Sequence, residues 1–238
     1  MTDRPRWETR GDRRLLRVVD GALSAGAQRA GDRLACRVGC TECCVGPFPI
    51  TLVDARRLRE GLAQLQEREP KRAAEIARRA RAAVRAMRRA FPGDAATGRL
   101  SEEELARERF FARHEARPCP VLDPVTGACE LYATRPLTCR SYGPPLRAGG
   151  EKLPPCRLCF VGASARTIES FRVTVDPEGL EDRLLQRLQR EGEPAIPETL
   201  VAFALAAAPQ RSRRRHSASG RRAPASGGSR GNRGGRAT

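Results

Sequence analysis

Four cysteines lie within nine residues of the chain, at Cys36, Cys40, Cys43 and Cys44. In a helix these positions would share one face, and in a loop the Cys40-x-x-Cys43 spacing lets two thiolates bind one ion. A hydrophobic core needs no such cluster, because one cysteine packs only as a small apolar side chain. The spacing therefore predicts a site for a metal or a metal cluster. The alternatives are disulfide bonds or a chance grouping.

Five further cysteines follow, at Cys119, Cys129, Cys139, Cys156 and Cys159. Antiparallel pairing around an Asp-Pro-x-x-Gly turn would bring Cys119 and Cys129 together, and the second Cys-x-x-Cys lies in a proline-rich loop typical of metal knuckles. Nine thiols suffice for two four-thiolate sites, or for one metal and several structural cysteines. Adjacent Cys43 and Cys44 suit one small tetrahedral ion poorly, because the peptide between them is rigid. They could serve two neighbouring ions or a larger iron–sulfur cluster.

Basic and aromatic residues accompany the cysteines. Four thiolates on a divalent ion carry a net charge of −2, which nearby guanidinium groups would offset while donating to sulfur. The arginines in such positions are Arg33, Arg37, Arg135, Arg140 and Arg157. Tyr132 and Tyr142 could line a substrate pocket with Arg135, but packing around the cysteine site is the simpler interpretation. His114, five residues before Cys119, could be a ligand, but an exposed histidine at a helix end is the commoner case, because the nearby cysteines already suffice.

Composition limits the fold and the compartment. The chain has 238 residues and only 4% aromatics, so its core must be largely aliphatic and a metal could supply missing stability. An odd number of cysteines leaves one over in a full disulfide framework. Residues 1–14 carry alternating charges and no apolar run, which predicts a reducing, cytoplasmic location. No apolar run is long enough for a membrane span, so no membrane association is expected.

The net charge of +17 is concentrated near the C-terminus. Residues 209–238 hold nine arginines and no acid, which leaves 17 − 9 = +8 for the rest of the chain. This Arg/Gly/Ser-rich segment is predicted to be a disordered tail that binds nucleic acid weakly and electrostatically. It has no aromatic residue for base stacking. The basic face of residues 71–89 is a second candidate, although a solvated helix face is the commoner case.

Apolar spacing predicts a mostly α fold with a small β-hairpin. Helices are expected over 12–30, from Thr51 or Asp54 onward, over 71–90, after Leu180 and over 200–208, with a strand at 171–175. The predicted core is irregular and cysteine-rich, with a helical insertion between two cysteine blocks. The expected divisions are an N-terminal extension (1–33), a cysteine-cluster domain (34–160) with its insertion (54–115), a C-terminal strand and helices packing on it (161–208), and the tail (209–238).

The cysteine spacing resembles that of the YkgJ-like cysteine-cluster family, whose members are described as zinc- or iron-chelating. The resemblance covers about residues 34–160 and rests on Cys36-x3-Cys40-x2-Cys43-Cys44, Cys119-Pro-x-Leu122, Gly127-x-Cys129-x2-Tyr132-x2-Arg135-Pro136-x2-Cys139-Arg140-x-Tyr142 and a later cysteine. The ligand set that it implies is Cys36, Cys40, Cys43, Cys44, Cys119, Cys129, Cys139 and Cys156. Cys159 has no counterpart in this pattern, and the resemblance supplies no reaction.

Three functions remain open at this point. The first is a binding or structural protein folded around zinc or iron. The second is an enzyme that uses an iron–sulfur cluster, such as 4Fe–4S, for redox or group-transfer chemistry. The third is a zinc module that binds nucleic acid without sequence specificity. No residue pattern identifies a protein partner or a substrate.

Overall fold

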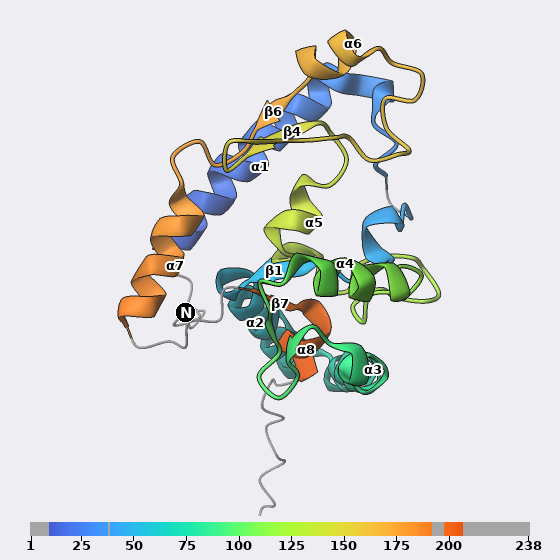
Figure 1. The fold of residues 1–238 in the computed structure, drawn as a ribbon, viewed down its shortest axis with the longest axis vertical. Coiled ribbons are helices and arrows are strands. Elements are labelled where there is room, and N and C mark those ends of the chain that lie inside the picture. Colours follow the sequence, from blue (N-terminus) through green and yellow to red (C-terminus); the bar gives the residue numbers. More distant parts are fainter. Residues whose placement is uncertain (1–9, 38, 192–197, 207–238) are drawn as a thin grey trace, which may run out of the picture. The chain divides into compact units, whose positions relative to one another are not determined.

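The computed structural model describes residues 10–37, 39–191 and 198–206. The fold is mostly helical with small sheets, as predicted. The longer helices are α1 (Arg10–Ala30), α2 (Leu52–Arg68), α3 (Pro70–Met87), α4 (Glu104–Arg113) and α7 (Leu180–Arg190) (Figure 1). The shorter ones are α5 (Leu137–Ser141), α6 (Ala165–Ser170) and α8 (Val201–Ala206). Single 3-10 turns are η1 (Gly31–Arg33), η2 (Glu42–Cys44), η3 (Arg88–Ala90) and η4 (Tyr132–Thr134).

In the part of the chain that the structure describes, the strands are short and form three separate sheets. One antiparallel pair joins β1 (Pro49–Thr51) to β7 (Glu198–Leu200), and another joins β2 (Gly93–Asp94) to β3 (Arg99–Leu100). The third sheet has the order β5-β4-β6, with β4 and β6 parallel. Its strands are β4 (Leu146–Ala148), β5 (Glu151–Leu153) and β6 (Val173–Thr174).

The turn predicted between Cys119 and Cys129 is present, but its flanks are barely extended. Gly127 N donates to Asp123 O at 2.9 Å, and a single antiparallel bridge pairs Leu122 with Cys129. The strand predicted over 171–175 is likewise shorter and comprises only β6.

The predicted apolar stripe of α2 is confirmed. Thr51 caps the helix by accepting a hydrogen bond from Asp54 N, and Leu58, Leu62 and Leu65 are buried. The stripe packs against α3 and α8, which lie beside α2 in Figure 1. The helices α2, α3 and α8 therefore form the scaffold beside which the cysteine loops are placed.

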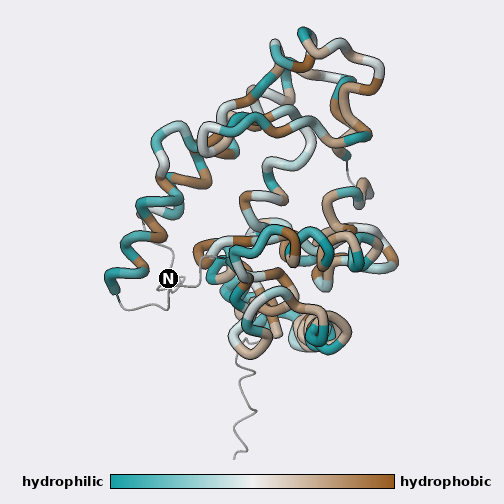
Figure 2. Tube along the Cα trace, viewed as in Figure 1, coloured by the Kyte–Doolittle hydropathy of each residue, from teal (hydrophilic) through white to brown (hydrophobic). Residues whose placement is uncertain are grey.

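A second apolar cluster joins α1 and α7. Leu15 and Val19 of α1 pack with Leu180, Leu184 and Leu188 of α7. Figure 2 shows hydrophobic and hydrophilic positions alternating along α7, as expected of a helix that buries one face. Within the described ranges, no helix combines the length and apolar character needed to cross a membrane. The predicted tail lies outside the described residues, and the chain divides at this point into units Met1–Ala208 and Pro209–Thr238.

Candidate metal centre

All nine cysteines line one cavity of about 560 Å³. Each is a free thiol. The structure thus brings together the eight predicted ligands and also Cys159, which the family pattern did not place. The predicted neighbours Tyr132, Arg135, Arg140 and Tyr142 line the same cavity, and His114 is not among its lining residues.

The first cysteine segment is held as a compact loop. Cys40 N donates to Arg37 O at 3.0 Å, and Cys44 N donates to Thr41 O at 2.7 Å. Cys119 N donates to Cys44 O at 2.8 Å, beside an antiparallel bridge between Val45 and Pro118. This backbone contact places the start of the second cysteine block against the end of the first.

Arginines of α3 hold the loop that carries Cys119 and Cys129. Arg79 donates to Pro120 O at 2.9 Å and also forms an ion pair with Glu130. Arg72 reaches the same carboxylate at 2.6 Å. The Glu130 side chain is 5% exposed, so its charge needs these partners. Part of the basic face of α3 therefore positions cysteines and is not simply solvated.

A buried ion network positions Cys139. Arg57 is 1% exposed and binds Asp12 of α1 at 2.7 Å and Asp54 of α2 at 2.5 Å. Asp54 also accepts a hydrogen bond from Leu137 N at 3.0 Å, at the start of α5. Desolvation raises the pKa of Asp54, opposed by the positive charge of Arg57. The network fixes α5 against α2, with Cys139 on the first turns of α5.

The Cys156–Cys159 loop closes on the first segment. Cys159 N donates to Cys156 O at 2.8 Å, and the chain then turns through a left-handed Phe160 with φ 55°. Cys156 N donates to Gly143 O at 2.9 Å. A Cβ at Gly143, whose φ is +134°, would lie 2.6 Å from Cys36 Sγ. The missing side chain of Gly143 thus lets Cys36 approach the Cys156 loop.

The thiols fall into two groups by their mutual interactions. Cys159 lies close enough to Cys36 and to Cys156 to raise the pKa of both, and Cys40 also raises the pKa of Cys36. We call Cys36, Cys40, Cys156 and Cys159 the Cys36 group. Cys119 and Cys129 interact with each other and with Cys43, while Cys44 and Cys139 both interact with these three. We call Cys43, Cys44, Cys119, Cys129 and Cys139 the Cys119 group.

Burial and crowding keep most of these thiols protonated in the metal-free protein. Burial raises the pKa of Cys36 to about 12, with the nearby Cys159, Cys40 and Cys156 adding to the rise. Burial likewise raises the pKa of Cys119 to about 12. Cys43 is the exception, because a hydrogen bond from Cys44 and the charge of Arg135 lower its pKa to about 7. A bound cation would reverse the trend, since a coordinated thiol is deprotonated.

Backbone amides oppose the effect of burial at three of the sulfurs. The N–H groups of Val121, Leu131 and Leu158 each lower the pKa of the cysteine two residues earlier, against the larger rise that burial causes at Cys119, Cys129 and Cys156. An N–H close to a sulfur favours its charged form and therefore suits a thiolate better than a thiol. Both cysteine groups contain at least one such amide.

Two of the predicted arginine neighbours, Arg135 and Arg140, have different roles. The Arg135 guanidinium lies 3.8 Å from the centre of the Tyr132 ring, and its charge lowers the pKa of Cys43. Arg140 instead binds backbone oxygens of Arg135 and Ala133 and the carboxylate of Asp20 at 2.9 Å. Arg140 therefore ties α5 to α1.

His114 is buried against Phe110, with ring centres 4.8 Å apart. Burial and the nearby Arg117 lower its pKa. His114 caps the C-terminal end of α4, as predicted, but the expectation that it would be exposed is wrong, because its ring packs against Phe110.

The donor chemistry of the cavity fits zinc or iron. Thiolates are the ligands that structural zinc sites and iron–sulfur clusters use, and the backbone N–H groups beside Cys119, Cys129 and Cys156 favour their charged forms. Among the described residues, no three or more His, Cys, Asp or Glu side chains stand in an arrangement that could hold an ion. The sulfurs line the cavity wall in this conformation.

Sequence reasoning missed two features of the site. Cys159 lines the cavity, and the sequence signal that could have identified it is its Cys-x-x-Cys spacing with Cys156. Glu42 and Arg157, which each stand between cysteines, form an ion pair between the two cysteine segments. Arg157 was expected to offset thiolate charge, but its pairing with Glu42 has no local signal, because the two residues are more than a hundred positions apart.

Comparison with known proteins agrees with this chemistry. No curated protein and no solved structure matches the chain. The CxxCxxCC family model, described as a putative zinc- or iron-chelating domain, matches residues 35–157, more than half of the chain. The chain therefore belongs to this YkgJ-like cysteine-cluster family, and the resemblance noted in the sequence is confirmed.

Proposed function

We propose that the cavity binds zinc or iron through cysteine thiolates and that the metal holds the surrounding segments together. The observation that carries this proposal is the convergence of nine thiols, from positions as far apart as Cys36 and Cys159, on one cavity.

A structural role explains the surroundings of the site. The described contacts that position the cysteines are backbone hydrogen bonds, buried ion pairs and a glycine contact, which fix ligands in place. Closed thiolate sites of this kind contribute to folding and do not need an open coordination position. Loss of the metal should therefore be measured first by its effect on structure.

The experiment is metal analysis of the full-length protein purified under anaerobic, reducing conditions. We expect zinc or iron in stoichiometric amounts, and removal with a strong chelator should change the circular dichroism. A protein that takes up neither metal, even after incubation with Zn²⁺ or Fe²⁺ under reducing conditions, would overturn the proposal.

An iron–sulfur cluster is favoured by one observation. Adjacent Cys43 and Cys44 fall in the same five-thiol group, and a cluster offers ligand positions further apart than a single ion does. The visible spectrum separates the alternatives, because Zn²⁺ has a filled d shell and is colourless, whereas iron–sulfur clusters absorb visible light. Redox or group-transfer catalysis would be considered only if the cluster were present.

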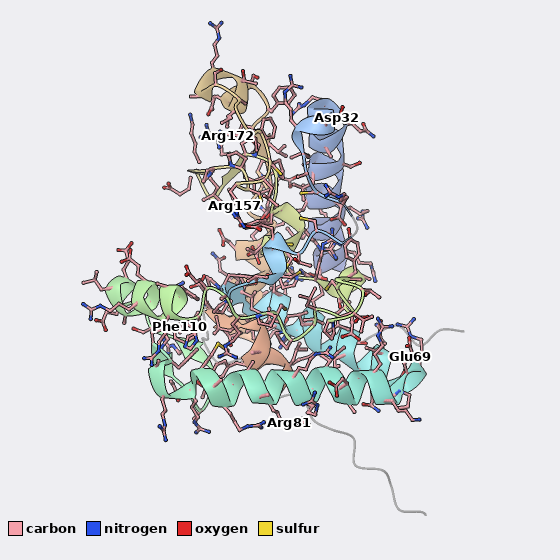
Figure 3. All side chains as sticks on the ribbon, turned by 90° about the vertical axis from the view of Figure 1, so that its right-hand side faces the viewer. Asp32, Glu69, Arg81, Phe110, Arg157 and Arg172 are labelled. Carbon is pink, nitrogen blue, oxygen red and sulfur yellow. The ribbon has the colours of Figure 1, made fainter. Side chains whose placement is uncertain are left out.

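Weak nucleic-acid binding is a separate proposal based on charge. The nine arginines of residues 209–238 lie outside the described residues, while Arg81 projects from the outer side of α3 (Figure 3). Binding through these charges should weaken steeply with salt. Truncation after Ala208 should lower the affinity at low salt and leave the metal content unchanged.

A cytoplasmic location is proposed from the thiol chemistry. All nine cysteines are free in the structure, and a reducing compartment keeps thiols available for metal. Fractionation of cells that express the tagged full chain would test this location.

A further inference from the structure

We propose that the cavity contains two metal sites and that Cys159 is the fourth thiolate of one of them. This inference rests on the proposed metal binding and specifies how the ligands are shared. The Cys36 group supplies four sulfurs to one site, and the Cys119 group supplies the sulfurs of the other site. Cys159 lies outside residues 35–157, the part of the chain that the family model matches.

The first argument is the set of contacts that Cys159 makes. Cys159 and Cys156 pack in one cluster, where they are 4% and 8% exposed, and both raise the pKa of Cys36. Cys36 and Cys156 lie more than a hundred residues apart in the sequence, yet both contact Gly143. The Gly143 oxygen accepts from Cys156 N at 2.9 Å, and a Cβ at Gly143 would lie 2.6 Å from Cys36 Sγ. A purely packing cysteine would gain nothing from two other thiols as its polar neighbours.

The second argument is the local backbone. Cys156 and Cys159 are joined by a tight turn in which Cys159 N donates to Cys156 O at 2.8 Å, and the Leu158 N–H lies near enough to the Cys156 sulfur to lower its pKa. The left-handed Phe160 then reverses the chain, and its N–H donates to Arg33 O at 2.8 Å. A Cys-x-x-Cys turn with an amide directed at its first sulfur presents two thiolates on one side of the loop. The turn also holds that loop against the segment just before Cys36.

The third argument is the division of the first cysteine segment. Cys36 interacts with Cys156 and Cys159 and also with Cys40, whereas Cys43 and Cys44 interact with Cys119 and Cys129, and Cys119 N donates to Cys44 O at 2.8 Å. The segment therefore contributes two thiols to each group. Four thiols complete a tetrahedral ion in the Cys36 group, and the five thiols of the Cys119 group suit an ion with one spare thiol or a cluster.

The test measures Zn²⁺ bound per chain after loading reduced, full-length protein with Zn²⁺ and removing the excess. Wild type should retain two equivalents. Cys159→Ser leaves three thiols in the Cys36 group and should retain one equivalent. Cys119→Ser/Cys129→Ser leaves three thiols in the Cys119 group and should also retain one, and the triple variant should retain none. Val161→Ser, an 81% exposed position two residues after Cys159, is the matched control and should retain two.

A second measurement uses the unaltered protein, in case a variant does not fold. Zn²⁺-loaded wild type is titrated with a chelator, exposed thiols are alkylated, and the modified cysteines are identified by mass spectrometry. The four thiols of the Cys36 group should become reactive together, in a step separate from the thiols of the Cys119 group.

The outcomes distinguish this inference from the proposed function. Wild type that binds no Zn²⁺ would overturn both. One equivalent in wild type, two equivalents in Cys159→Ser, or simultaneous exposure of all nine thiols would overturn the two-site inference while leaving metal binding intact.

Discussion

Arg157 and Glu42 form a two-point ion pair beside the cysteine cavity, which Glu42 lines. The Arg157 Nη2 atom lies 2.9 Å from Glu42 Oε2, and Arg157 Nε contacts the other carboxylate oxygen. Glu42 stands between Cys40 and Cys43, and Arg157 follows Cys156. The pair therefore links the first and last cysteine segments directly, next to the sulfurs that we assign to metal. Figure 3 labels Arg157 beside this region.

Removing this pair should speed metal loss without preventing metal binding. Arg157 is 76% exposed, and exposed ion pairs contribute little because solvent and salt screen them. Arg157→Ala and Glu42→Gln should each release Zn²⁺ to a chelator modestly faster than wild type. The difference should shrink at high salt, where the wild-type pair is itself weakened. Arg166→Ala, an exposed arginine on α6, is the control, and an equal effect there would show that the pair is irrelevant.

The residues that sequence reasoning predicted are those with local patterns. The spacing of the cysteines predicted a metal site, and the apolar stripe that includes Leu58 and Leu62 predicted helix α2. Both patterns could be recognised because their residues recur within short stretches of the sequence. Arg57 was not predicted as buried, since a charged residue enters a core only when distant partners such as Asp12 compensate it. The parallel pairing of β4 with β6 is likewise non-local. Long-range pairs of this kind leave no periodic signal in a single sequence.

Gly143→Ala should weaken the site on the Cys36 side. Its new Cβ would lie 2.6 Å from Cys36 Sγ, and its φ of +134° is unfavourable for any side chain. We expect the loss of one Zn²⁺ equivalent and a destabilisation of about 1–3 kcal/mol. Gly149→Ala is the control, because Gly149 also has positive φ but nothing lies within 4 Å of its Cβ position. If both variants kept full Zn²⁺, the close approach of Gly143 and Cys36 would not matter for binding.

Arg57→Met should strongly destabilise the fold. It would leave the carboxylates of Asp12 and Asp54 buried without their shared cation, and breaking such a pair costs about 3–5 kcal/mol. Chemical denaturation measures this loss. Asp54→Asn should cost less, because Asn still offers an oxygen to Leu137 N and removes a buried charge. A larger loss in Asp54→Asn than in Arg57→Met would contradict this account.

Stability should fall between about pH 4.5 and pH 7 because of Glu181. Burial raises the pKa of Glu181 from 4.5 to about 7, with the negative charge of Asp54 adding to the rise. The folded state therefore holds a proton that the unfolded state releases at lower pH. The favourable contribution of Glu181 is greatest below pH 4.5 and is lost as the pH rises toward 7.

Glu181→Gln should remove this dependence, since glutamine is neutral and its oxygen can still accept from Thr51. The variant should gain stability relative to wild type as the pH rises from 5 to 8, by on the order of 3 kcal/mol in full. Parallel denaturation curves at pH 5 and pH 8 measure the difference. A constant offset between the two proteins would refute the assignment to Glu181.

Removing the metal should unfold the region around the cavity. About 75 residues separate Cys44 from Cys119, and the described contacts that join the cysteine loops are few and partly exposed. A structural thiolate site contributes on the order of 10 kcal/mol, which is comparable with the whole stability of a domain, about 5–15 kcal/mol. Acidification should act in the same direction, because protons compete with the metal for thiolates.

Circular dichroism and limited proteolysis before and after chelation, under reducing conditions and with metal loss confirmed, measure the effect. Cleavage should appear first between residues 34 and 160. A fully stripped protein that kept a cooperative melt would mean that the α2, α3 and α8 core folds without the metal and that the cysteines serve binding alone.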